Sequence, residues 1–78
     1  MKVFEERLLQ CRNNIHKTQH DVAKEAGLNF RTYCRYERGE AEPTLPPLVK
    51  LANYFHVSLD YLAGLTDDPT WRGPAEEP

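Results

Sequence analysis

The chain has 78 residues, which is enough for one domain with a single core but not for a second, catalytic lobe. Apolar residues make up 40% and charged residues 28% of it, which is typical of a globular chain, and the net charge of −2 is low for a protein that binds nucleic acid. No apolar run is long enough to span a bilayer and the first residues, MKVFEER, are too polar for a signal peptide, so we expect a cytoplasmic protein.

Two helices are expected before residue 27. The first covers residues 3–14, because apolar residues recur at helical spacing at Phe4, Leu8, Cys11 and Ile15. The second covers residues 19–26. Thr18 precedes it and Asp21 follows three residues later, a pattern related to the capping box. Its inward side carries Val22, Ala23 and Ala26.

A short turn separates the second helix from a third. Gly27 suits the left-handed position that ends many helices, and Asn29 is a strong N-cap residue. The third helix therefore covers residues 30–38, and Gly39 marks its end. Helices this short are marginal alone, so they must be held by packing.

Two further helices are expected after residue 43. Proline fits only in or before the first turn of a helix, so the fourth helix should start near Pro47 and end near His56. Its core face consists of Leu48, Leu51, Ala52 and Phe55. Ser58 can cap a last helix over residues 59–63, which Gly64 ends.

These patterns predict an all-α domain of five helices over residues 1–65, in which the second and third helices form a helix-turn-helix. No segment shows the two-residue alternation of a β-strand. Residues 66–78 contain three prolines and four acidic residues without periodicity, so we expect a flexible tail there.

The third helix separates cationic from aromatic side chains. At about 100° per residue, Arg31, Arg35 and Arg38 share an arc of about 60°, whereas Tyr33 and Tyr36 point to the other side. Arginine is well suited to read the O6 and N7 atoms of guanine in a major groove. The alternative is an ordinary solvated face, but such a face usually intersperses acidic residues, and here Glu37 is the only one.

The charge distribution also favours the first half of the chain as the contact surface. Residues 1–38 contain eight Lys or Arg and five acidic residues, which gives +3, whereas residues 39–78 contain two and seven, which gives −5. Because the acidic half would repel a duplex, any contact with DNA must be made by the first half.

The sequence resembles the Cro and phage-repressor (Xre-like) helix-turn-helix family over about residues 5–68. The likeness rests on several short matches spread along the chain: Thr18-Gln19, Val22-Ala23, Ala26-Gly27, the run from Arg35 to Gly39, Pro43, Leu48-Lys50-Leu51-Ala52 and Val57 to Leu62. It implies a compact, lambda-repressor-like fold and a transcriptional regulator, most simply a repressor, that reads the major groove of double-stranded DNA.

The resemblance also implies roles for individual residues. The positions that read bases match Phe30, Arg31 and Arg35, with Thr32 and Cys34 close enough to assist. An aromatic residue at position 30 is unusual, and its edge would suit a thymine methyl group; if the ring folds onto the core instead, the arginines make the base contacts. Phosphate contacts are expected from Lys17, Thr18, Gln19, Asn29 and Arg38.

Three further features come from the same resemblance. Arg12 and Glu37 match a structural ion pair that ties the first helix to the end of the third. Lys17 stands where the family commonly has an apolar residue, so it either contacts phosphate or is a plain surface lysine. A homodimer on a palindromic operator is expected, with Tyr61, Leu65 and Trp71 as candidate contacts; Trp71 could equally be disordered.

Other chemistry has little support in the residues. Cys11 and Cys34 are expected to be free thiols. The helix break near Lys17 separates His16 from His20, so no zinc site is predicted. No phosphate-binding glycine loop or catalytic constellation is present, so we expect neither an enzyme nor a cofactor.

Two rival functions fit the same residues. The protein could be an antitoxin that binds a toxin and represses its own operon. It could also be a protein-interaction module that does not bind DNA, in which case the arginines of the third helix would be dispensable.

Overall fold

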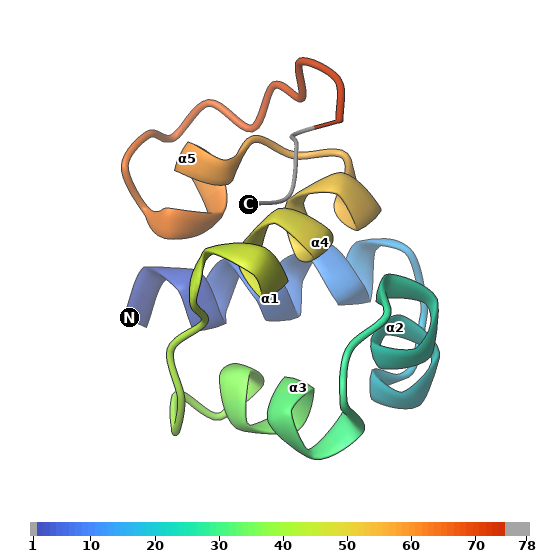
Figure 1. Cartoon of the computed structure of the whole chain (residues 1–78). Helices are drawn as coiled ribbons and strands as arrows, with labels where there is room; N and C mark the ends of the chain where they lie inside the picture. Colours follow the sequence, from blue (N-terminus) through green and yellow to red (C-terminus); the bar gives the residue numbers. More distant parts are fainter. Residues whose placement is uncertain (1, 75–78) are drawn as a thin grey trace.

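Five α-helices form the domain in the computed structural model, which describes residues 2–74 (Figure 1). They are α1 (Lys2–Asn14), α2 (Gln19–Ala26), α3 (Phe30–Glu37), α4 (Leu45–Phe55) and α5 (Leu59–Ala63). No strand occurs in residues 2–74, which confirms the all-α prediction. None of the described helices combines the length and apolar character that a membrane span requires.

The helix ends follow from local side-chain chemistry. Both bonds of the capping box are present at α2: Asp21 N donates to Thr18 Oγ1 at 3.1 Å, and Thr18 N donates to Asp21 Oδ2 at 3.3 Å. Gly27, with φ of 78°, ends this helix in the left-handed region. At α3, Asn29 Oδ1 accepts from Thr32 N at 3.1 Å. The predicted bounds of α2 are therefore confirmed, and those of α5 also agree.

The start of α4 was predicted too late. The helix begins at Leu45, two residues before Pro47, so both prolines lie within its first turn. The backbone N–H groups of the first turn have no hydrogen-bond partner inside a helix, so proline, which lacks this group, removes no helical hydrogen bond there. The end of α3 also differs by one residue, because Arg38 forms the C-cap outside the helix.

One hydrophobic core joins all five helices. Its buried members are Phe4, Leu8, Val22, Ala23, Tyr33, Tyr36, Leu51, Ala52 and Leu62. The placement of Ile15 on the core face of the first helix was wrong: its side chain is 43% exposed. Because α1 ends at Asn14, the helical spacing no longer applies at position 15, and the next residue, His16, has φ of 56°.

Residues 66–74 run over α5 and back toward the end of α4 without forming a helix (Figure 1). Arg7 of α1 donates to the carbonyl of Thr66 at 2.6 Å and pairs with Asp67 at 2.7 Å. The indole of Trp71 stacks on the ring of His56, with centroids 4.1 Å apart. The flexibility expected of residues 66–78 stays a prediction, and residues 75–78 lie outside the described part of the chain.

The carboxylate of Glu37 is the point where α1, α2 and α3 meet. Its Oε2 accepts from Arg12 Nε at 2.7 Å and from Tyr33 Oη at 2.5 Å. Its Oε1 accepts from Arg12 Nη2 at 3.1 Å and from Gln19 Nε2 at 2.9 Å. The Glu37 side chain is only 4% exposed and that of Arg12 17%. Four donors therefore satisfy a charge that burial alone would disfavour.

The same contacts set the acidity of this carboxyl group. Burial raises the pKa of Glu37, but the hydrogen bonds from Arg12, Tyr33 and Gln19 lower it by more, so the pKa lies below its ordinary value. Burial, followed by the bond to Glu37, raises the pKa of the Tyr33 hydroxyl, which therefore stays protonated and remains a donor.

Removing either charge of this cluster should destabilise the domain. We expect Arg12→Ala and Glu37→Gln each to lower the free energy of unfolding by about 2 to 3 kcal/mol, because each leaves the opposite partner incompletely paired in a largely buried site. Thermal and urea unfolding measure this, and Arg31→Ala, an exposed arginine, is the control. Unchanged melting in Arg12→Ala would show that the pair adds nothing to stability.

The cluster should also weaken in acid. A lowered pKa in the folded state means that the stabilisation from Glu37 is complete above the unfolded value of about 4.5 and is lost as the pH falls through the folded value. The stability gap between the native chain and Glu37→Gln should therefore shrink as the pH falls from 6 toward about 3. Urea titrations of both proteins measure the gap, and a gap independent of pH would contradict the assignment.

Candidate nucleic-acid interface

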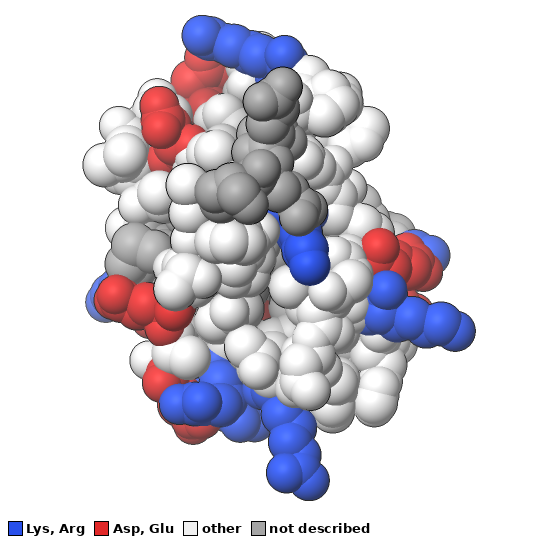
Figure 2. Space-filling model, in the orientation of Figure 1, with Lys and Arg blue, Asp and Glu red and all other residues white. Residues whose placement is uncertain are grey.

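The outer face of α3 carries exposed arginines at one end of the molecule. Tyr33 and Tyr36 of this helix are buried at 0% and 5% exposure, whereas Arg31, Arg35 and Arg38 are exposed. Basic side chains gather at the end of the molecule where α3 lies (Figure 2). The separation of rings and guanidinium groups seen in the sequence is thus present in three dimensions.

A shallow groove of about 440 Å³ runs along this face. Its lining brings together side chains from the first turn of α2 and from the length of α3, namely Gln19, Phe30, Arg31, Cys34, Arg35 and Arg38. Four of the five residues expected to read bases therefore lie at one concavity. The fifth, Thr32, is half-buried, and both its backbone N and its hydroxyl donate to Asn29 Oδ1, at 3.1 and 3.4 Å.

Gln19 connects the two helices of the helix-turn-helix. Its Nε2 donates to Glu37 at 2.9 Å, and its Oε1 accepts from Cys34 Sγ at 3.5 Å. Cys34 itself is only 6% exposed. Both ends of the amide thus face partners on α3, so Gln19 braces α3 against the start of α2.

The residues expected to contact phosphate lie at the start of α2 and at the two ends of α3. Lys17 is exposed, and its Nζ lies 3.4 Å from the carboxylate of Glu25. The Thr18 hydroxyl caps α2, and the Asn29 side chain caps α3, so both serve helix ends as well. Arg38 Nε lies 3.2 Å from the carboxylate of Glu40.

Two residues at this surface were missed by the sequence reasoning. Glu40 pairs with Arg38, and its carbonyl accepts from Arg35 Nη2 at 3.2 Å. His20 stacks on Phe30 with ring centroids 3.6 Å apart and planes 5° from parallel. The Arg-x-Glu spacing could have indicated the first contact, but the second depends on the turn between the helices and has no signal in the sequence.

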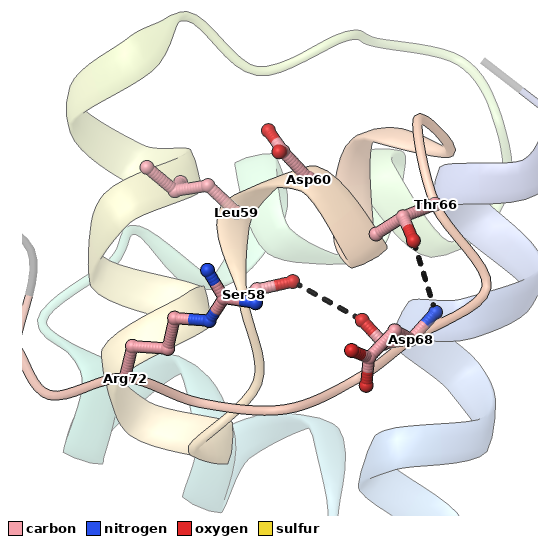
Figure 3. A pocket seen from close by; sticks show the side chains of 6 residues that line it. All are labelled: Ser58, Leu59, Asp60, Thr66, Asp68 and Arg72. Atoms are coloured by element: carbon pink, nitrogen blue, oxygen red, sulfur yellow. Dashed lines mark hydrogen bonds between the residues drawn. The ribbon is translucent and has the colours of Figure 1, made fainter.

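A second concavity lies on the acidic half of the chain. It measures about 300 Å³ and is lined by Ser58, Leu59, Asp60, Thr66, Asp68 and Arg72 (Figure 3). Ser58 Oγ donates to the carbonyl of Asp68, and Asp68 N donates to Thr66 Oγ1 at 3.1 Å, so its walls are tied to one another. Two carboxylates against one guanidinium make it unsuitable for a phosphate backbone.

The candidate dimer residues differ in their surroundings. The guanidinium carbon of Arg7 lies over the ring of Tyr61, 4.1 Å from the ring centroid. Leu65 is 77% exposed, the most exposed large apolar side chain in residues 2–74. Trp71 is half-buried against His56, and its Nε1 is buried without a hydrogen-bond partner among the described residues.

Comparison with known proteins identifies the family of this chain. The helix-turn-helix family model matches residues 8–62. The cryptic phage CTXphi transcriptional repressor RstR of Vibrio cholerae serotype O1 is 44% identical over 64 residues, 82% of this chain and 56% of the relative. In Bacillus subtilis, the uncharacterized HTH-type transcriptional regulator YobD is 41% identical over 64 residues, 82% of this chain and 57% of the relative.

A third relative is the SPbeta prophage-derived uncharacterized HTH-type transcriptional regulator YonR of Bacillus subtilis, 42% identical over 60 residues, 77% of this chain and 56% of the relative. The chain spans little more than half the length of these relatives. No solved structure gave a significant match. The matched region contains both helices of the interface, and the chain belongs to the helix-turn-helix family, in its Cro-like and phage-repressor (Xre-like) branch.

Proposed function

We propose that this domain is a sequence-specific binder of double-stranded DNA that acts as a transcriptional repressor, with α3 inserted into the major groove. The observation that carries the proposal is the exposure of Arg31 and Arg35 along one groove of a helix whose inner face is fixed by the Glu37 cluster. A rigidly held guanidinium group can donate two hydrogen bonds to O6 and N7 of guanine.

The relatives support the regulatory part of the proposal. Among them is a phage protein named as a transcriptional repressor, and others are named as HTH-type transcriptional regulators. Binding alone is sufficient for repression, so the proposal includes no catalytic step and no cofactor. It also places the protein in the cytoplasm.

Phosphate contacts would hold the domain in register on the duplex. Gln19 and Phe30, from the N-terminal turns of α2 and α3, line the groove together with Arg38, and Lys17 precedes α2 by two residues, so we propose that the two cations and the two N-terminal turns contact the flanking phosphates. Both cations already have acidic neighbours, Glu25 and Glu40. A single domain therefore has few unopposed cations, and we propose that it binds a palindromic operator as a homodimer.

The base contacts are tested by single arginine substitutions. After selecting a preferred site from random duplexes, we expect Arg31→Ala and Arg35→Ala each to lose about 1 to 3 kcal/mol of discrimination at one base pair, because each removes a bidentate contact. Fluorescence anisotropy with all single-base variants of the site measures this.

Arg72→Ala is the matched control, since Arg72 is an exposed arginine that lines the acidic concavity and not the α3 groove. We expect it to leave the discrimination intact. Full activity of both α3 variants would favour a protein-interaction module and overturn the DNA-binding proposal.

The dimer is tested by sedimentation with and without DNA. A palindromic duplex with half-sites about 34 Å apart should bind two copies of the chain cooperatively, whereas a duplex with a single half-site should bind one copy weakly. Binding of one copy with equal affinity to both duplexes would remove the dimer from the proposal while leaving DNA binding in place.

A further inference from the structure

The ring of Phe30 is confined between two surfaces. One side packs against the hydrophobic core, and the other lies parallel to the imidazole of His20, 3.6 Å away. His20 belongs to the first turn of α2 and is itself exposed, whereas Phe30 opens α3 and is half-buried. An exposed imidazole thus covers an aromatic face that would otherwise contact water.

This confinement restricts the orientation of Phe30. Rotation of the ring about its side-chain torsions would either break the stack or drive it into a close-packed core. The ring is not folded wholly onto the core: it is half-buried and still lines the groove with Arg31, Arg35 and Arg38. Phe30 has no hydrogen-bonding atom in its side chain, so it forms an apolar contact point within a groove that three arginines also line.

The major groove of DNA offers one apolar group to such a contact. The 5-methyl group of thymine is the only base substituent there that neither donates nor accepts a hydrogen bond. Burying one methyl group is worth about 0.8 kcal/mol, or about a fourfold change in affinity. A fourfold change in affinity can be measured. Such a small gain would be lost if the partner side chain had to be ordered on binding, so the partner has to be held in place beforehand.

We infer that His20 is a positioning residue for sequence recognition, which holds the ring of Phe30 where it contacts the methyl group of one thymine in each half-site. The inference rests on the proposed DNA-binding function and adds to it a base preference together with the residue that enforces it. The contribution of His20 comes from its flat face.

Deoxyuridine scanning tests the methyl contact directly. Each thymine of the selected site is replaced in turn by deoxyuridine, which lacks only that methyl group, and affinities are measured by anisotropy. We expect one thymine per half-site whose replacement weakens binding about fourfold. In Phe30→Ala this sensitivity should vanish at the same position, whereas Lys24→Ala, on the exposed side of α2, should retain it.

Variants of His20 separate positioning from charge. We expect His20→Ala and His20→Lys to reduce the penalty for deoxyuridine at that position to less than twofold, and His20→Phe to keep it near fourfold, because phenylalanine preserves the stack without the imidazole nitrogens. Circular dichroism melting confirms that each variant is folded, which an exposed position should permit.

The outcomes distinguish this inference from the function on which it rests. Tight binding to the selected site with no thymine sensitive to deoxyuridine overturns the methyl contact alone. Full sensitivity in His20→Ala overturns the role of His20, and rescue by lysine but not by phenylalanine shows that charge, not stacking, is what matters. Failure to bind any duplex overturns the proposed function itself.

Discussion

The carboxylate of Glu37 is the contact on which the rest of the arrangement depends. An eight-residue helix such as α3 is not stable in isolation, so its position depends on contacts with the rest of the domain. Burial of Tyr33 and Tyr36 turns the arginines outward. Four directional hydrogen bonds to one largely buried carboxylate, from Arg12, Gln19 and Tyr33, then fix the helix against α1 and α2 in that orientation.

The cluster contributes specificity of orientation more than net stability. Burying a charged pair costs desolvation free energy that its attraction only partly offsets, so apolar residues of the same size could stabilise the fold equally well. Apolar residues would not impose the directional hydrogen-bond geometry of a carboxylate that accepts from donors on α1, α2 and α3. If α3 presents side chains to base edges, as proposed, this fixed geometry would hold them within fractions of an ångström of their partners.

Much of the fold could be predicted from the sequence because its helix ends are encoded locally. Thr18, Asn29 and Ser58 each accept a bond from the backbone three residues later, so each cap can be recognised without tertiary information. The errors arose where an assumption about local pattern failed. Ile15 continued an apolar spacing beyond the end of its helix. The start of α4 was expected near Pro47, but the helix begins at Leu45 and holds both prolines in its first turn.

The site was less predictable than the fold, for a physical reason. Periodicity places Arg31, Arg35 and Arg38 on one face of a helix, but it does not say what approaches that face from another element. The stack of His20 on Phe30 joins residues on two helices, and its geometry depends on the turn between them. Trp71 against His56 is a similar case, in which an irregular segment folds back onto a helix end.

Glu40 bears on how the small positive surface would act. Its carboxylate opposes Arg38 and its carbonyl accepts from Arg35, so part of the positive potential is neutralised before any ligand arrives. Both arginines and Glu40 are exposed, which makes the ion pair weak and easily exchanged for a phosphate. On the proposed function, non-specific attraction to DNA would thereby be reduced, while the bidentate contacts proposed for Arg31 and Arg35 would form only at the correct site. A modest positive surface thus favours discrimination between sequences over raw affinity, because the electrostatic contribution is the one that every sequence shares.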